Sequence, residues 1–264
     1  MLTIDKYLRA ASLEEAYEAL QKKNSAVLGG MLWMRLGNRR IGTAIDLSAL
    51  GLDGVEDTGD CWRIGAYTSL RTIETHVGLN ESVCGVMRDA VRDIVGVQFR
   101  NLATVGGSVF GRFGFSDVVT TLLALGASVE LYRGGVVSLE EFCNMGRVRD
   151  ILTHVILPKR PVCACYAAQR NSATDFPVLN TCAVLDGETL TVTVGARPLR
   201  AVAYRFMVNP SEDAEAQAER IAAHIAQKTV LVSNRRASEE YRRHLCRVLV
   251  RRAVCDVLGG KERD

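Results

Sequence analysis

Apolar and polar positions along the first fifty residues alternate in a way that predicts a small sheet with interleaved helices. Short apolar runs predict strands, and apolar residues at three- and four-residue spacing between the first two runs predict a helix. Ser12 and Glu15 fit a capping box at the start of that helix. The resulting β-α-β-α-β order favours parallel pairing. The expected strands are residues 2–4, 25–28 and 43–47, and a second helical piece is expected at residues 31–36.

The pattern from residue 53 to residue 160 predicts a second group of strands and helices. Ser116 and Ser138 are placed to cap helices, and Ser138 forms a second capping box with Glu141. Residues 98–108 show neither helical nor alternating spacing, so we expect an irregular segment there. The expected strands are residues 62–66, 128–132 and 150–157, and the expected helices are residues 69–75, 81–95 and 117–125.

The last part of the chain reads as three strands followed by two helices. Asp186-Gly187 between two apolar runs predicts a hairpin. A break around residues 158–162, marked by Pro158 and Pro161, is the best domain boundary. The expected strands are residues 163–169, 178–185 and 189–194, and the expected helices are residues 211–227 and 238–258.

Composition places the chain among ordinary globular proteins. Of its 264 residues, 48% are hydrophobic and 24% are charged, and the net charge of +3 gives no reason to expect a nucleic-acid or membrane partner. No apolar run approaches the length of a spanning helix, and the N-terminus lacks the pattern of a signal peptide, so we expect a cytoplasmic protein. The 8 cysteines are therefore expected to be reduced. They form no CxxC motif and the 4 histidines lie far apart, so no metal site is expected in this chain.

Two glycine pairs, Gly29-Gly30 and Gly106-Gly107, are the candidates for ligand binding. Paired glycines let a backbone approach a ligand closely and adopt positive φ angles. Successive N–H groups in such a turn bind an anion, so two loops suit the two phosphates of a pyrophosphate. Neither loop matches the Rossmann or P-loop pattern. A third pair, Gly134-Gly135, is interpreted as a plain hairpin turn.

The last helix carries a cluster of arginines beside an apolar stripe. The stripe predicts the face that packs on the sheet. For the arginines two interpretations remain open, a solvated face and a contact with a partner subunit. The arginines are Arg242, Arg243, Arg247, Arg251 and Arg252, and the stripe is Cys246, Leu249, Val250, Ala253 and Val257.

Several stretches of the chain match, in order, those of one known family. The most specific is residues 98–107, Gln-Phe-Arg-Asn-Leu-Ala-Thr-Val-Gly-Gly. On these stretches the chain resembles the FAD-binding subunits of the molybdenum hydroxylases, the group of xanthine dehydrogenase and carbon monoxide dehydrogenase. The other stretches are residues 27–30, 44–48, 62–66 with Thr68, 116–117 with 122–127, 150–152 with 156–158, 236–245 and 250–253.

The resemblance implies that the two glycine loops hold the pyrophosphate of a non-covalently bound FAD. It also implies that Asp117 lies on the ribose or adenine side and Leu152 near the flavin end. The alternative for Asp117 is a place in the first turn of a helix, where a carboxylate is stabilised by the helix dipole. No acid–base residue is implied, because the chemistry belongs to the flavin. The implied loop residues are Leu28, Gly29, Gly30, Met31, Leu32 and Trp33, and Thr104, Val105, Gly106, Gly107 and Ser108.

Some positions depart from the family pattern. Met31 stands where the first loop usually continues with a hydroxyl residue, and Ser108 stands where the second usually ends in Asn. Trp33 either shields the cofactor or packs its helix against the sheet. Three phenylalanines either flank the flavin ring or pack in the interior, namely Phe110, Phe113 and Phe115.

The resemblance implies an α+β fold. It places a two-subdomain FAD-binding domain of the PCMH/vanillyl-alcohol-oxidase type at residues 1–160, with subdomains at about 1–52 and 53–160. Residues 161–264 should form a small α+β domain like the C-terminal domain of the CO dehydrogenase flavoprotein, a three-stranded sheet with helices.

The resemblance also implies an oxidoreductase subunit that transfers electrons within a xanthine dehydrogenase-like hetero-oligomer. An iron–sulfur subunit would deliver electrons from a molybdopterin-binding subunit that oxidises a purine-like heterocycle or an aldehyde. The final acceptor would be NAD or another molecule. Two alternatives remain open: a scaffold subunit that has lost FAD, and a free-standing flavin reductase of the same fold.

Overall fold

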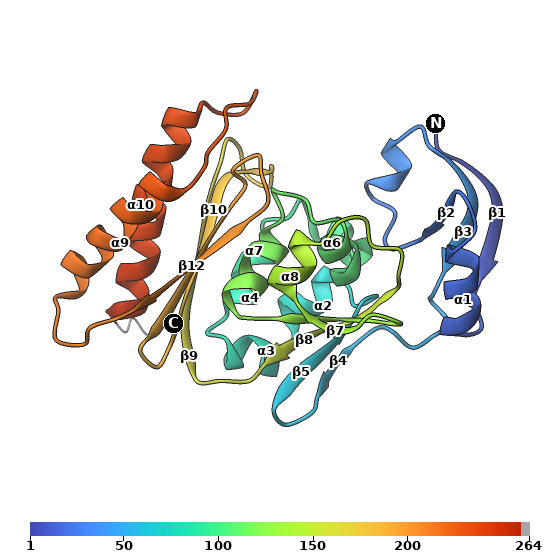
Figure 1. Cartoon of the computed structure of the whole chain (residues 1–264), viewed down its shortest axis with the longest axis horizontal. Coiled ribbons are helices and arrows are strands. Elements are labelled where there is room, and N and C mark those ends of the chain that lie inside the picture. Colours follow the sequence, from blue (N-terminus) through green and yellow to red (C-terminus); the bar gives the residue numbers. More distant parts are fainter. Residues whose placement is uncertain (260–264) are drawn as a thin grey trace. The chain divides into compact units, whose positions relative to one another are not determined.

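The computed structural model describes residues 1–259 and divides the chain into two compact units (Figure 1). The first unit comprises Met1–Thr72, Val97–Gly111 and Ala127–Pro158. The second unit comprises Ile73–Gly96, Arg112–Gly126 and the chain from Lys159 onward. Two segments that precede the predicted boundary near residue 160 are thus packed in the second unit.

A small parallel sheet opens the first unit, as the apolar pattern predicts. Its order is β1-β3-β2, with both pairings parallel. Helix α1 connects β1 to β2, and its N-cap Ser12 accepts a hydrogen bond from the Glu15 backbone N–H. The first loop of interest follows β2 and leads into the short 3-10 helix η1. The elements are β1 (Thr3–Arg9), α1 (Leu13–Leu20), β2 (Ser25–Val27), η1 (Met34–Leu36) and β3 (Arg40–Asp46).

A five-stranded antiparallel sheet forms the rest of the first unit, in the order β4-β5-β8-β6-β7. Helix α6 packs on its central strands β5 and β8, and α8 packs on β6 and β7. The strands are β4 (Val55–Asp57), β5 (Cys61–Gly65), β6 (Ser128–Leu131), β7 (Gly135–Ser138) and β8 (Leu152–Pro158). The helices are α5 (Val97–Leu102), α6 (Val105–Phe110) and α8 (Leu139–Asn144), and α2 (Leu70–Thr75) lies where the chain passes to the second unit.

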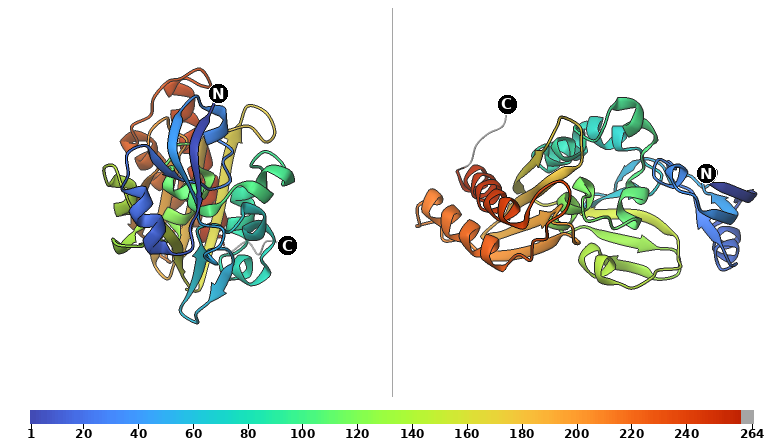
Figure 2. Two further views of the ribbon diagram at one scale, coloured as in Figure 1. Left: turned by 90° about the vertical axis from the view of Figure 1, so that its right-hand side faces the viewer. Right: turned by 90° about the horizontal axis from the view of Figure 1, so that it is seen from above.

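The second unit is built on a four-stranded antiparallel sheet, in the order β12-β11-β10-β9. Helices α9 and α10 lie side by side against one face, and α7 packs against β10 and β11 on the other (Figures 1 and 2). Strand β10 is accordingly buried along eight of its ten residues. The strands are β9 (Val162–Arg170), β10 (Pro177–Asp186), β11 (Thr189–Gly195) and β12 (Val202–Met207), and the helices are α3 (Val77–Ser82), α4 (Val86–Val91), α7 (Asp117–Ala124), α9 (Ala214–Lys228) and α10 (Glu239–Leu258).

Three expectations about local structure were wrong. The C-terminal sheet has four strands instead of three, because β12 is a half-exposed edge strand whose apolar pattern is weak. The helix expected at residues 81–95 is divided into α3 and α4, because Cys84 and Gly85 both adopt positive φ angles (53° and 71°). Residues 98–108 are not irregular; they belong to the two short helices α5 and α6.

The arginines of α10 do not share one environment. Arg242 is only 1% exposed; its guanidinium donates to the carbonyls of Val178 and Ala196 and to the Asn234 side chain. It lies four residues before Cys246 and so falls on the buried stripe, which the sequence spacing could have indicated. This corrects its placement with the outward-facing arginines.

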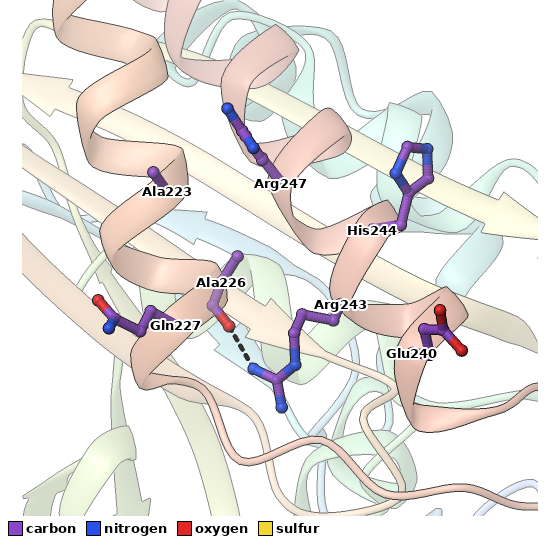
Figure 3. Close-up of a pocket in the computed structure, with 7 residues that line it drawn as sticks. All are labelled: Ala223, Ala226, Gln227, Glu240, Arg243, His244 and Arg247. Atoms are coloured by element: carbon purple, nitrogen blue, oxygen red, sulfur yellow. Dashed lines mark hydrogen bonds between the residues drawn. The ribbon is translucent and has the colours of Figure 1, made fainter.

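Three of the outer arginines of α10 form ion pairs with glutamates. Arg243 pairs with Glu239 (2.7 Å), Arg247 with Glu219, and Arg251 with Glu215 (2.9 Å). A pocket of about 580 Å³ lies between α9 and α10, where Arg243 also donates to the Ala226 carbonyl (Figure 3). None of its lining residues is a site residue predicted from the sequence. Within residues 1–259, no helix is long and apolar enough to cross a membrane.

Candidate cofactor site

The first glycine loop leaves β2 with its backbone donors unused. The Leu28 N–H still donates to the Ile45 carbonyl (2.8 Å), which is the last hydrogen bond of the β2–β3 ladder. Within the described part of the chain, the next four N–H groups, at residues 29–32, have no hydrogen-bond acceptor. Met31 adopts a left-handed conformation with φ of 57°. Successive free N–H groups around a left-handed residue form a concave site for an anion.

The second glycine pair lies in the first turn of α6, and its donors are engaged. Thr104 caps the helix by accepting from the Gly107 N–H (3.1 Å). The N–H groups of Val105 and Gly106 donate to the carbonyls of Thr68 and Ala66 (2.9 and 2.8 Å), and that of Ser108 donates to the Thr104 carbonyl. The backbone of this loop therefore offers a ligand an exposed surface at Gly107 instead of a set of free donors.

The glycines are required for space and not for positive φ angles. None of the four has a positive φ. A Cβ on Gly30 would lie 1.9 Å from the Leu102 carbonyl oxygen, and one on Gly106 would lie 2.7 Å from Ala66 Cβ. A Cβ on Gly29 would meet the Thr104 hydroxyl at 3.0 Å. The first loop and the segment that holds the second are thus in direct contact.

One turn holds both loops, and its central residue was not identified from the sequence. Residues 66–68 accept the N–H groups of the second loop through the Ala66 and Thr68 carbonyls. The Tyr67 hydroxyl donates to the carbonyl of Leu28, where the first loop begins. A single tyrosine after a strand gives no local sign of such a contact, because its partner lies 39 residues earlier.

Leu152 and Trp33 differ in exposure. Leu152 begins β8 and is 5% exposed. The carbonyl of the next residue, Thr153, accepts a hydrogen bond from the Ala66 N–H (2.8 Å). Leu152 is thus adjacent in sequence to a residue that contacts the turn at residues 66–68. Trp33 is 45% exposed, whereas Leu28 and Leu32 are buried. The roles of these residues toward a flavin remain predictions.

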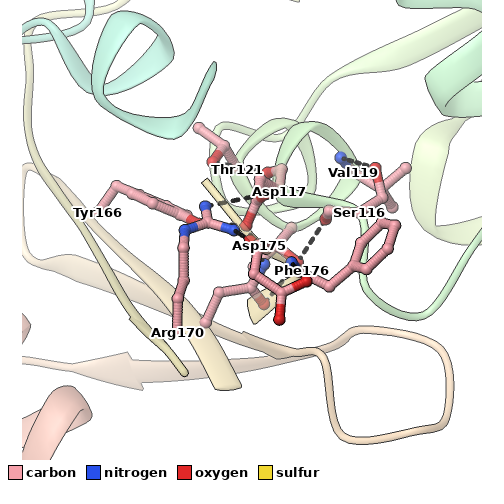
Figure 4. A network of polar contacts seen from close by, with 10 residues as sticks. Ser116, Asp117, Val119, Thr121, Tyr166, Arg170, Asp175 and Phe176 are labelled. Atoms are coloured by element: carbon pink, nitrogen blue, oxygen red, sulfur yellow. Dashed lines mark hydrogen bonds and ion pairs between the residues drawn. The ribbon is translucent and has the colours of Figure 1, made fainter. Parts of the chain in front are cut away.

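Asp117 lies in the second unit, buried in a polar network (Figure 4). It occupies the first turn of α7, whose N-cap is Ser116, as the capping pattern predicts. One carboxylate oxygen accepts from Tyr166 and from Asn180 Nδ2 (2.8 Å), and the other lies 3.1 Å from Arg170 Nη2.

Burial raises the pKa of the Asp117 carboxyl, and the Arg170 charge and the hydrogen bonds from Tyr166 and Asn180 oppose the rise. Both oxygens already have protein partners, so its role toward a ribose remains a prediction.

The three phenylalanines for which flanking a flavin and interior packing were both open are divided between the units. Phe110 packs against Phe142 within the first unit, with ring centroids 5.8 Å apart. In the second unit Phe113 stacks on Phe115 (5.2 Å), and Phe115 contacts Phe176 (4.6 Å). Phe113 is 42% exposed, so one face of this cluster is open to solvent.

Two family models together match most of the chain. The model for the FAD binding domain in molybdopterin dehydrogenase matches residues 2–160, which is more than half of the chain. The chain belongs to this FAD-binding family of the molybdopterin dehydrogenases. The model for the CO dehydrogenase flavoprotein C-terminal domain matches residues 164–257 of this chain.

Relatives and solved structures resemble this chain over almost its full length. The medium subunit of nicotine 6-hydroxylase from Paenarthrobacter nicotinovorans is 26% identical over 275 residues, covering 95% of this chain and 96% of its own. A chain of the Cu,Mo-CO dehydrogenase crystal structure has a TM-score of 0.84 at 21% identity, covering 99% and 100%. A chain of quinoline 2-oxidoreductase from Pseudomonas putida 86 has a TM-score of 0.83 at 18% identity, covering 100% and 99%. The expected α+β fold is confirmed.

The first loop fits the cofactor that defines the family. FAD carries a doubly charged pyrophosphate, and four free N–H groups around Met31 are suited to bind it. Because these donors belong to the backbone, Met31 can replace a hydroxyl residue without removing them. The free N–H groups of residues 29–32 therefore fit the pyrophosphate of FAD, and binding of FAD at these residues remains a prediction.

We expect alanine substitutions at two glycines to have different effects on stability. Gly30→Ala should lower the melting temperature and abolish FAD binding, because the new Cβ overlaps the Leu102 carbonyl. Gly107→Ala should keep the melting temperature, since its Cβ meets only the Thr104 hydroxyl at 3.0 Å and alanine favours the helix. If Gly107 faces the pyrophosphate, the Gly107→Ala methyl should lower FAD affinity about tenfold, roughly 1.4 kcal/mol.

Thermal unfolding and FAD titration measure both effects. Gly146→Ala is the matched control, because no atom lies within 4 Å of its Cβ and its φ is not positive. Full FAD affinity in Gly107→Ala would remove the second loop from the binding surface.

Neutralising Asp117 alone should destabilise the second unit. Asp117→Asn leaves the charge of Arg170 buried without a counter-ion, at a cost of about 3–5 kcal/mol. In the double variant Asp117→Asn with Arg170→Gln both charges are gone, so most of that stability should return. Chemical denaturation measures the free energy of unfolding, and FAD titration separates the roles. FAD affinity that recovers with stability assigns Asp117 to internal packing, and affinity that stays low assigns it to the ribose.

Proposed function

We propose that this chain is the FAD-carrying electron-transfer subunit of a molybdenum hydroxylase complex. In this proposal a molybdopterin-binding subunit oxidises a purine-like heterocycle or an aldehyde, and an iron–sulfur subunit conducts the electrons to this chain. The electrons leave to NAD or another acceptor. The observation that carries the proposal is the backbone cradle on residues 29–32, located in a chain that matches the FAD-binding and flavoprotein C-terminal models in order.

FAD supplies reversible acceptance and release of electrons when it is bound. The chain supplies binding and orientation. Its free N–H groups at residues 29–32 would hold the pyrophosphate, and the buried side chains of Leu28 and Leu32 anchor both ends of that loop in the protein interior. The exposed Trp33 next to the loop is available to cover one side of the cofactor.

Membership of a complex is supported by the similarity to the medium subunit of nicotine 6-hydroxylase. Its match covers nearly the whole of both chains, so the resemblance concerns an entire subunit. We infer an assembly with an iron–sulfur subunit and a molybdopterin-binding subunit, located in the cytoplasm.

The purified chain should be yellow and should release FAD, not FMN, when it is denatured. A cradle of four N–H groups is suited to the pyrophosphate that only FAD contains. Neither loop, at residues 28–33 or 104–108, contains a His or Cys that could form a covalent flavin link. Chromatography of the released chromophore distinguishes the two flavins. A colourless chain that takes up no added FAD would support the alternative of a scaffold subunit that has lost its cofactor.

The chain should reduce an acceptor only within its complex. Purification from the native source should bring down an iron–sulfur chain and a molybdopterin chain in fixed proportion. The complex should reduce NAD or an artificial acceptor when a heterocycle or aldehyde is supplied, and the isolated chain should not. Turnover of substrate and acceptor by the isolated chain would favour a free-standing flavin reductase. A monomer in the native extract would contradict the assembly.

A further inference from the structure

Tyr67 occupies a break in the parallel ladder between β2 and β3. In such a ladder a residue that donates to one neighbour on the adjacent strand accepts from the neighbour two positions further on. Leu28 donates to the Ile45 carbonyl, so its own carbonyl would next accept the Leu47 N–H. Instead the Leu47 N–H donates to the Tyr67 hydroxyl (3.0 Å), and that hydroxyl donates to the Leu28 carbonyl.

The hydroxyl therefore replaces one rung of the sheet and holds the strand ends apart. It uses one donor and one acceptor, which satisfies both backbone groups at the point where β2 ends. The Tyr67 ring packs against the core that contains Ile45 and Leu47, and this packing holds the hydroxyl in place. The first glycine loop begins with the next residue after this bridge.

The turn that carries Tyr67 also fixes the second loop. The carbonyls of Ala66 and Thr68, on either side of Tyr67, accept the N–H groups of Gly106 and Val105. The turn itself is tied to the sheet, because the Tyr67 N–H donates to the Leu52 carbonyl (2.8 Å) and the Ala66 N–H to the Thr153 carbonyl (2.8 Å). Three successive residues thus connect both loops to the same rigid support.

We propose that Tyr67 is a positioning residue for FAD, whose hydroxyl sets where the first glycine loop leaves its strand and hence its distance from the second. The proposal rests on the proposed function, because the ligand that the loops bind is FAD. Tyr67 acts through the loop backbone and makes no contact with the cofactor itself.

The Tyr67 hydroxyl is protonated at neutral pH. Burial raises the pKa of Tyr67 to about 12, and the nearby acid Asp46 adds to the rise, whereas the hydrogen bond from Leu47 opposes it. The hydroxyl thus keeps the proton that it donates to Leu28 at neutral pH.

The test is Tyr67→Phe in the full chain. Losing the hydroxyl leaves the Leu47 N–H and the Leu28 carbonyl without their bridge, so the loop should shift and FAD affinity should fall about tenfold. The matched control is Tyr204→Phe, which removes a tyrosine hydroxyl bonded to Thr229 (3.0 Å) in the second unit. It should change stability to a similar extent and leave FAD affinity unchanged.

Hydrogen exchange of the FAD-free protein provides the second readout. Tyr67→Phe should speed amide exchange at Leu47, whose N–H donates to the Tyr67 hydroxyl, and Tyr204→Phe should not. Wild-type FAD affinity in Tyr67→Phe, or equal loss of FAD in both variants, would overturn the proposal. If the wild-type chain takes up no FAD, the proposed function fails. In that case the exchange rates still decide whether Tyr67 holds the loop.

Discussion

The close approach of two backbone segments is the constraint on which the candidate site depends. The first loop passes so near the Leu102 carbonyl that Gly30 cannot carry a side chain, and a Cβ on Gly106 would lie only 2.7 Å from Ala66 Cβ. These contacts replace side-chain packing with backbone contact. The N–H groups that such a site presents belong to the backbone and not to the side chain at position 31. The free N–H groups at residues 29–32 are thus present although Met31 stands where a hydroxyl residue is usual in the family.

A different kind of constraint organises the second unit. The charge of Asp117 is enclosed with Arg170, Tyr166 and Asn180, and a neighbouring bond joins Thr193 to the Thr120 carbonyl (2.9 Å). Buried polar groups of this kind have few acceptable arrangements, because each lost partner leaves a desolvated charge or donor. The network therefore fixes the position of α7 on the sheet more specifically than apolar contacts would.

The sequence predicted best what depends on neighbours in the chain. Helix starts at Ser12, Ser116 and Ser138 are local capping signals, and the structure confirms each of them. The two glycine loops were found because glycine pairs and their flanking residues form a continuous pattern. What the sequence missed depends on distant residues: the Tyr67 bridge, the partners of Asp117, and the strand β12, which is defined by its pairing with β11. The division of the helix at residues 81–95 required positive φ at Cys84, which a sequence pattern does not indicate.

The segment that the FAD-binding family model matches does not coincide with either compact unit of the structure. The FAD-binding family model ends at residue 160, yet the chain passes between the units five times before that point or at it. A fragment cut there would retain the glycine loops but strip α7 of the sheet that covers it, and would leave Asp117 facing water without Arg170. Recombination among relatives at this junction would have to preserve the contacts of α7 with β10 and β11. The C-terminal sheet is therefore needed to cover α7, which belongs to the segment that the FAD-binding model matches. Neither of the two matched segments can be exchanged without the other.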